Sequence, residues 1–73
     1  MVIYRTEAYG GYGKNNKYYN EYRQENGKIY KYKIHIYKFF DGHENEWRED
    51  EKIVDEWAVN DPNIPEWLKN YIQ

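Results

Sequence analysis

The chain has 73 residues, no cysteine and a formal net charge of −2, which leaves room for a single domain, 1–73, and excludes disulfides. No run approaches the ~20 apolar residues of a membrane helix, and residues 1–5 lack the apolar core of a signal peptide, so we expect a cytoplasmic protein without membrane contact. Aromatic residues make up 21% of the chain, which argues against disorder and predicts a core built largely from rings.

The first half of the chain reads as strands and turns. Residues 2–9 alternate in the manner of a strand, and the glycine-rich stretch 10–16 predicts a loop. Its glycines fit no phosphate-binding motif, because such motifs need a helix directly behind them. Asn26-Gly27 lies between two β-prone runs, and this dipeptide is the strongest short hairpin signal because a type I′ turn needs positive φ at both positions. We therefore predict strands over 17–25 and 28–40.

Residues 47–59 allow two interpretations. Several glutamates and the spacing of the apolar residues favour a helix. A strand that folds back on 28–40 across a loop at 41–46 would instead place Phe40 by Trp47 and Ile34 by Ile53. Repeated aromatic and opposite-charge pairs of this kind stabilise antiparallel strands, so we favour the strand.

The C-terminal residues predict a short amphipathic helix over 63–72. Asn63 and Glu66 have the spacing of a capping box, and the apolar residues that follow recur at helical intervals. A helix this short needs a surface to dock on. The apolar face of the sheet is the expected place.

These elements predict an α+β fold, a small antiparallel β-meander of about four strands with one C-terminal helix. The alternative has three strands and two helices. The expected core residues are Tyr30, Ile34, Ile36, Phe40, Ile53, Trp57, Trp67, Leu68 and Ile72. One helix covers one face of a sheet, so a homodimer through the second face is a further expectation.

The composition argues against an enzyme. The chain has no cysteine, no serine and a single threonine, Thr6, so few side chains could act as a catalytic nucleophile. His35 is expected to be a partly exposed strand residue. His43 lies in an acidic loop whose spacing matches no zinc or calcium motif. We expect no catalytic residue, no metal and no cofactor.

Charge is divided unevenly along the chain and suggests two binding surfaces. Residues 1–40 hold eight basic and three acidic groups, whereas residues 41–73 hold three basic and ten acidic groups. The two halves could simply pair with each other in the fold. Alternatively, each half could steer a partner of opposite charge.

The acidic half carries the leading functional hypothesis. A row of carboxylates beside exposed tryptophan can imitate nucleic acid and anchor an interface. We therefore expect a small non-enzymatic accessory or inhibitor protein, of the kind that phages or mobile elements encode, that binds a host protein, with a nucleic-acid-binding protein as one such target. The predicted partner-binding residues are Glu46, Trp47, Glu49, Asp50, Glu51, Asp55 and Glu56.

The basic half carries the alternative hypothesis. Tyrosines and lysines that alternate along strands place stacking rings beside phosphate-pairing cations, the combination that binds single-stranded nucleic acid. No RNA-binding motif accompanies them, and the negative net charge is unusual for such proteins. The residues of this alternative nucleic-acid face are Tyr18, Tyr22, Lys31, Lys33 and Tyr37.

Overall fold

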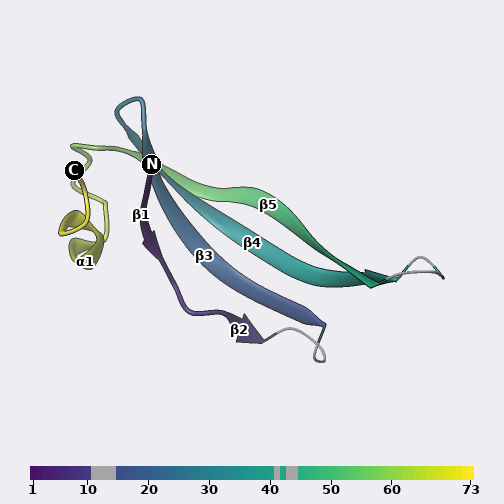
Figure 1. Cartoon of the computed structure of the whole chain (residues 1–73). Helices are drawn as coiled ribbons and strands as arrows, with labels where there is room; N and C mark the ends of the chain where they lie inside the picture. Colours follow the sequence, from purple (N-terminus) through teal and green to yellow (C-terminus); the bar gives the residue numbers. More distant parts are fainter. Residues whose placement is uncertain (11–14, 41, 43–44) are drawn as a thin grey trace.

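A computed structural model describes residues 1–10, 15–40, 42 and 45–73, and within them the chain forms an antiparallel sheet and one short helix (Figure 1). The elements are β1 (Val2–Arg5), β2 (Tyr9–Gly10), β3 (Asn16–Glu25), β4 (Lys28–Phe40), β5 (Asn45–Ala58) and α1 (Glu66–Lys69). The strand order is β1-β3-β4-β5, and β2 also pairs with β3. The predicted antiparallel sheet with a C-terminal helix is confirmed in outline, and so is the strand interpretation of 47–59.

The predicted strand 2–9 is interrupted and forms β1 and β2, which pair one after the other with β3. Thr6 lies at the interruption. Its backbone N–H donates to the Asn20 carbonyl over 2.9 Å, and its hydroxyl oxygen accepts from the Asn20 N–H over 2.9 Å. The side chain thus replaces a backbone partner where the ladder breaks. Part of the predicted loop 10–16 lies outside the described residues.

The turn between β3 and β4 is the hairpin turn that the sequence predicts. Asn26 has φ 50° and Gly27 has φ 77°, the two positive values of a type I′ turn. The turn sets Glu25 opposite Lys28 and fixes ten cross-strand pairs between β3 and β4.

The predicted register between β4 and β5 is wrong. Phe40 lies opposite Asn45 instead of Trp47, and Ile34 lies opposite Glu51 instead of Ile53. The strands continue closer to the connection than expected, which shifts the pairing by two residues. A bulge between Lys31 and Tyr32 of β4 and the facing residues of β5 changes the shift to one residue near the Asn-Gly turn.

The C-terminal segment packs on one face of the sheet, at the end nearest the Asn-Gly turn (Figure 1). Ile64 and Leu68 are buried there against Tyr22 and Ile29, with part of Ile3, Tyr4, Trp57 and Ile72 around them. Tyr22 and Ile29 share this face because alternate residues of a strand point to the same side.

Among the predicted core residues, Ile34 and Leu68 are fully buried. Tyr30, Ile36, Trp57 and Ile72 are half-buried. The prediction is wrong for Phe40, Ile53 and Trp67, which are exposed by 66%, 50% and 44%. It rested on the even-numbered residues of β4, whereas the C-terminal segment covers the face that carries the odd-numbered Ile29. Tyr22, Ile29 and Ile64 were therefore missed.

The predicted helix 63–72 is shorter than expected. It spans Glu66–Lys69, Pro65 is its N-cap, and no side chain caps it. Proline restricts the residue before it to extended backbone, so Ile64 cannot begin the helix. Asn63 is not a cap, and its backbone N–H donates to Asp61 Oδ1 over 2.8 Å.

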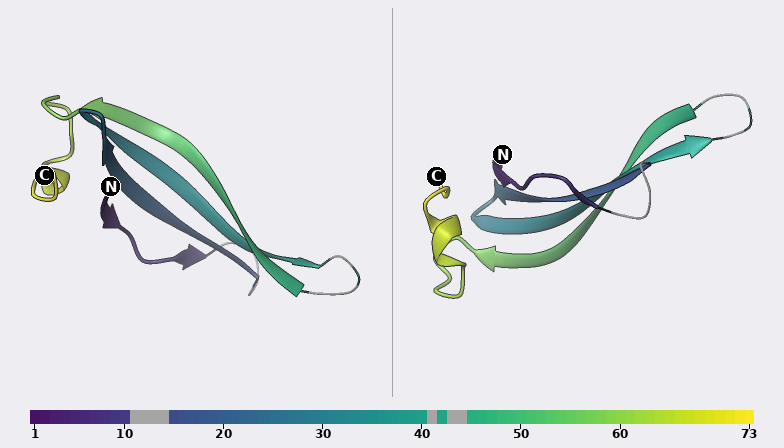
Figure 2. Two further views of the ribbon diagram at one scale, coloured as in Figure 1. Left: turned by 45° about the horizontal axis from the view of Figure 1, so that its top comes forward. Right: turned by 90° about the horizontal axis from the view of Figure 1, so that it is seen from below.

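The molecule is elongated, with principal extents of 49 × 22 × 17 Å. Figure 2 shows a strongly twisted sheet with both chain termini at one end and the end of β4 beside the start of β5 at the other. Across residues 1–10, 15–40, 42 and 45–73, no helix is long and apolar enough to cross a membrane.

Candidate functional site

The two faces of the sheet carry different chemistry. We call the face that holds Tyr22 and Ile29 the helix face, because the C-terminal segment covers one end of it. We call the opposite face the open face. The pairing assigns the residues of β5 to these faces, except Val54, which has no partner at the bulge. The helix face receives Glu46, Arg48, Asp50, Lys52, Asp55 and Trp57, and the open face receives Trp47, Glu49, Glu51, Ile53 and Glu56.

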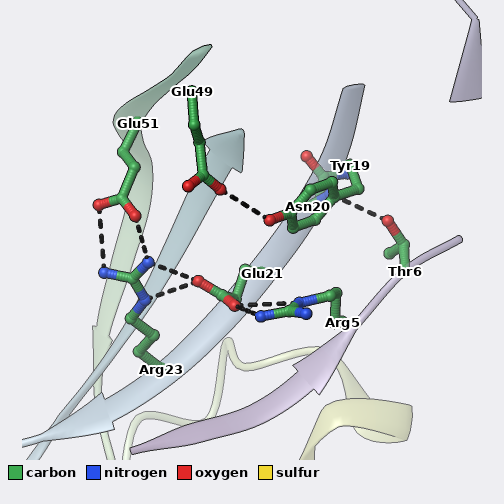
Figure 3. Close-up of polar contacts among 8 residues, drawn as sticks. All are labelled: Arg5, Thr6, Tyr19, Asn20, Glu21, Arg23, Glu49 and Glu51. Carbon is green, nitrogen blue, oxygen red and sulfur yellow. Dashed lines mark hydrogen bonds and ion pairs between the residues drawn. The ribbon is translucent and has the colours of Figure 1, made fainter. Parts of the chain in front are cut away.

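A buried carboxylate on the open face accepts hydrogen bonds from two arginines (Figure 3). Glu21 on β3 is 2% exposed. Arg5 Nε on β1 donates to Glu21 Oε1 over 3.1 Å, and Arg23 Nε donates to Glu21 Oε2 over 2.8 Å. One arginine occupies each oxygen, which is the arrangement that compensates a carboxylate removed from water.

The network reaches the acidic strand β5. Arg23 Nη2 donates to Glu51 Oε1 over 2.7 Å, and the Tyr19 hydroxyl donates to Glu49 Oε1 over 2.9 Å. Tyr19 and Glu51 are the direct neighbours of the fully buried Ile34 on the two adjoining strands. Part of the acidic run, by which we mean the predicted partner-binding carboxylates Glu46, Glu49, Asp50, Glu51, Asp55 and Glu56, therefore has a structural partner within the sheet.

These contacts shift the ionisation of the groups involved. Burial by itself raises the pKa of Glu21, but the hydrogen bonds from Arg5 and Arg23 outweigh it and hold the pKa below the usual value. The hydrogen bond to Glu51 raises the pKa of Arg23. Burial, followed by the hydrogen bond to Glu49, raises the pKa of Tyr19. At neutral pH, Glu21 and Arg23 are charged and Tyr19 is neutral.

An aromatic row crosses the uncovered part of the helix face. Tyr9 stacks on Tyr18 with centroids 6.1 Å apart, and Tyr18 stacks on His35 at 4.5 Å. Tyr37 follows at 4.9 Å from His35. His35 Nε2 lies 2.8 Å from Asn16 Oδ1. His35 is thus a half-buried strand residue, as expected from the sequence.

The structure places all five residues of the predicted nucleic-acid face on the helix face. Tyr18, Lys33 and Tyr37 lie together, and Lys33 Nζ stands 4.9 Å from the Tyr18 centroid. Lys31 lies nearer the C-terminal segment, 5.9 Å from the Tyr22 centroid. Tyr22, however, is only 5% exposed. It lies beneath Trp67, and the two rings meet edge-on with centroids 5.3 Å apart, so a nucleic-acid base cannot stack on Tyr22.

Two features of the helix face argue against the binding of single-stranded nucleic acid. The rings of the row stack on one another, so their faces are partly occupied before any base arrives. Asp50 and Asp55 of β5 share the face, opposite His35 and Lys31 respectively. Carboxylates at these positions repel a phosphate chain.

The seven predicted partner-binding residues all belong to one strand. They lie on β5, and each of them is exposed. The prediction treated them as one surface, but the structure divides them between the helix face and the open face. A partner that contacts all seven must therefore approach β5 from its outer side.

That outer side is free in the described chain, where β5 pairs only with β4. β5 has 14 residues and so extends for about 46 Å at 3.3 Å per residue. The opposite edge of the sheet is different, since β1 has four residues, β2 has two, and the ladder breaks between them. β5 is the longer edge and is continuous from Asn45 to Ala58, with one bulge in its pairing to β4.

No group of histidine, aspartate and glutamate side chains in the described residues has the geometry of a metal site, and no pocket forms among them. His43 and most of its acidic loop lie outside the described residues. Sequence reasoning missed the pair Glu21–Arg23. Its signal was the spacing of two residues, which puts both side chains on the same face of a strand.

Comparison with protein-family models, with curated proteins and with solved structures finds no match to this chain.

Proposed function

We propose that the protein is a non-enzymatic binding module that attaches to another protein through β5. The observation that carries the proposal is the position of β5: a long, exposed strand at the edge of the sheet that bears the carboxylates of the acidic run. An edge strand presents two faces and a row of backbone groups to a partner. Its acidic character favours a basic partner surface.

The carboxylates of β5 differ in how free they are to meet a partner. Glu51 pairs with Arg23, Glu56 with Lys28 at 4.0 Å, and Glu46 with Arg48 at 3.7 Å. In the described part of the chain, Asp50 and Asp55 have no ion pair, and Asp55 Oδ1 accepts a hydrogen bond from the Glu56 N–H over 2.9 Å. These two aspartates, both on the helix face, are the anions that a basic partner would neutralise most directly.

The biological role that fits such a module is that of an inhibitor or accessory protein, of the kind that a phage or mobile element directs at a host protein. A cytoplasmic setting accords with the absence of cysteine. A host protein with a basic, nucleic-acid-binding surface is the target class that the charge of β5 favours, because carboxylates on a strand can occupy a phosphate site.

The test is a charge reversal with a matched control. Asp50→Lys with Asp55→Lys should abolish capture of a specific host protein from a lysate, while Glu7→Lys with Glu66→Lys changes the net charge equally, away from β5, and should preserve it. Both variants should unfold at nearly the wild-type temperature, because exposed charges contribute little to stability. Equal capture by the two double variants would refute a role for β5.

The common placement of Tyr18, Lys31, Lys33 and Tyr37 on the helix face supports a second candidate, single-stranded nucleic acid. If it is correct, labelled oligonucleotides should bind with an affinity that falls steeply with salt. Lys33→Glu should then weaken binding, whereas Lys38→Glu on the open face should not. Absence of binding at low salt would rule out nucleic-acid binding, and protein binding would be the one remaining candidate function.

A further inference from the structure

We propose that the partner of β5 is an extended, basic segment of another protein that joins the sheet as an additional antiparallel or parallel strand. This inference rests on the proposed function and specifies how the partner is held. A strand added to an edge gains affinity from backbone hydrogen bonds and specificity from alternate side chains.

The backbone of β5 offers a defined set of hydrogen-bonding groups to such a strand. The Val59 N–H donates to the Gly27 carbonyl over 3.1 Å, which continues the register in which Lys28 faces Ala58 and Ile29 faces Trp57. Residues of an antiparallel pair alternate between bonding inward and pointing outward. The backbone groups of Glu56 and Ala58 therefore point away from β4, but the Glu56 N–H already donates to Asp55 Oδ1 over 2.9 Å and the Ala58 carbonyl accepts from the Asp61 N–H over 3.0 Å.

The middle of β5 offers backbone groups without such partners. The Lys38 N–H donates to the Asn15 carbonyl over 3.0 Å, so even-numbered residues of β4 bond toward β3 and odd-numbered ones toward β5. His35 faces Asp50, so Asp50 bonds inward. The backbone groups of its neighbours Glu49 and Glu51 therefore point toward an added strand.

Charge identifies the class of partner. Between residues 45 and 58 the chain has six acidic and two basic side chains. A second copy of β5 would bring the same excess of carboxylates, and like charges opposite each other destabilise paired strands. A segment rich in lysine or arginine replaces that repulsion by attraction. The charge of β5 thus disfavours pairing with a second copy of β5 and favours pairing with a basic strand.

The two faces of β5 define the pattern of that strand. Asp50 and Asp55 on the helix face would meet basic side chains. The carboxylates of the open face already have partners, Glu49 in Tyr19, Glu51 in Arg23 and Glu56 in Lys28. Trp47 and Ile53, which are 53% and 50% exposed on this face, would meet apolar side chains. Because side chains alternate along a strand, the partner segment should alternate basic and apolar residues over about ten positions.

The probe for the test is a fluorescein-labelled peptide of eleven residues in which lysine and valine alternate. We expect it to bind the wild type, and Asp50→Lys with Asp55→Lys to abolish that binding. The same peptide with two internal valines replaced by proline has the same charge but cannot continue a ladder. It should bind at least about tenfold more weakly, a difference of about 1.4 kcal/mol.

A pair of variants at Glu49 separates strand addition from charge attraction. Glu49→Ala and Glu49→Pro lose the same carboxylate and the same hydrogen bond from the Tyr19 hydroxyl, but only the proline removes the outward N–H. Proline is tolerated at such an outward edge position, and circular dichroism would verify that both variants are folded. Strand addition predicts about tenfold weaker peptide binding by Glu49→Pro than by Glu49→Ala.

Hydrogen exchange gives a readout that does not depend on substitution. Saturating peptide should slow exchange of the outward Glu49 and Glu51 amides by at least about tenfold. If Asp50 and Asp55 matter but the proline peptide, Glu49→Pro and the exchange rates show no difference, strand addition is wrong and the proposed function stands. If the wild type is instead a dimer that Glu49→Pro dissociates, the occupant is a second copy and the inference is overturned.

Discussion

At the scale of single residues, the turn between β3 and β4 depends on Gly27. Its φ of 77° lies in the left-handed region, and a Cβ built there would meet no atom within 4 Å. The cost of a substitution is therefore backbone strain and not a clash. A β-branched residue resists this conformation most strongly.

Gly27→Val should lower the free energy of unfolding by about 1 kcal/mol or more. Gly10→Val is the matched control, because Gly10 does not have φ in the left-handed region and has equally open surroundings. Urea denaturation monitored by circular dichroism would compare the two. A wild-type midpoint for Gly27→Val would contradict the type I′ geometry.

Glu21 is the residue on which the open face depends. Both of its oxygens accept from arginines, and its side chain is almost fully buried. Glu21→Gln keeps the shape but removes the charge that Arg5 and Arg23 share. We expect a loss of about 1–3 kcal/mol at pH 7, typical of hydrogen bonds to charged groups. The control Glu25→Gln alters an exposed position on the same strand and should change stability by less than about 0.5 kcal/mol.

The pH dependence of stability follows from the same contacts. The pKa of Glu21 is lowered by folding, so its contribution is present above the unfolded pKa of about 4.3 and is lost as the pH falls through the lower folded pKa. The difference in unfolding free energy between wild type and Glu21→Gln should therefore shrink as the pH falls below about 4. A constant difference between pH 7 and about pH 2 would contradict this account.

At the scale of elements, the C-terminal segment is held by few but well-placed contacts. Leu68 is fully buried, whereas its neighbours Trp67 and Lys69 are exposed. The chain terminus is also tied to β3, since the Gln73 N–H donates to Gln24 Oε1 over 2.8 Å. A one-turn helix has little stability alone, so these tertiary contacts maintain it.

Leu68→Ala should destabilise the protein by about 2–5 kcal/mol, the usual cost of truncating a buried leucine. Lys69→Ala, one residue further in the same helix, removes only an exposed contact with Glu66 and should change stability by less than about 0.5 kcal/mol. Thermal denaturation of both variants would measure the difference. Similar melting temperatures would mean that the C-terminal segment is not part of the cooperative core.

At the scale of the whole molecule, the elongated sheet leaves a long acidic edge accessible. Such an edge is an aggregation hazard that charged side chains suppress. The predicted homodimer through the open face stays a prediction; Phe40 and Trp47 are exposed on this face near the connection between β4 and β5.

Removing charge from β5 should increase self-association. Glu46→Gln, Asp50→Asn and Asp55→Asn together should raise the average mass with protein concentration, measured by light scattering after size exclusion, because the repulsion between two β5 edges is reduced. Glu7→Gln, Glu25→Gln and Glu66→Gln change the net charge equally elsewhere and should not. Identical masses for the two triple variants would show that the charge of β5 does not control association.

The sequence by itself determined the features that depend on neighbouring residues. Asn26-Gly27 required a turn with two positive φ values, and the alternation of tyrosine and lysine placed Tyr18, Lys31 and Lys33 on one face, because both signals act within a few residues. The local pattern of 47–59 favoured a helix, and the strand interpretation came from pairing with 28–40, in a register that differs from the observed one.

Only the tertiary structure decided which face is covered, how β4 and β5 are aligned, and where the acidic residues point. The predicted register was wrong because the strands pair closer to their connection than expected and because a bulge changes the offset by one residue. A shift of one residue in an antiparallel pair moves a side chain to the other face. Pro65 ended the expected capping box, and the side chosen by the C-terminal segment buried Tyr22 and Ile29 while exposing Phe40 and Ile53. These outcomes depend on contacts between residues distant in sequence, which local periodicity does not encode.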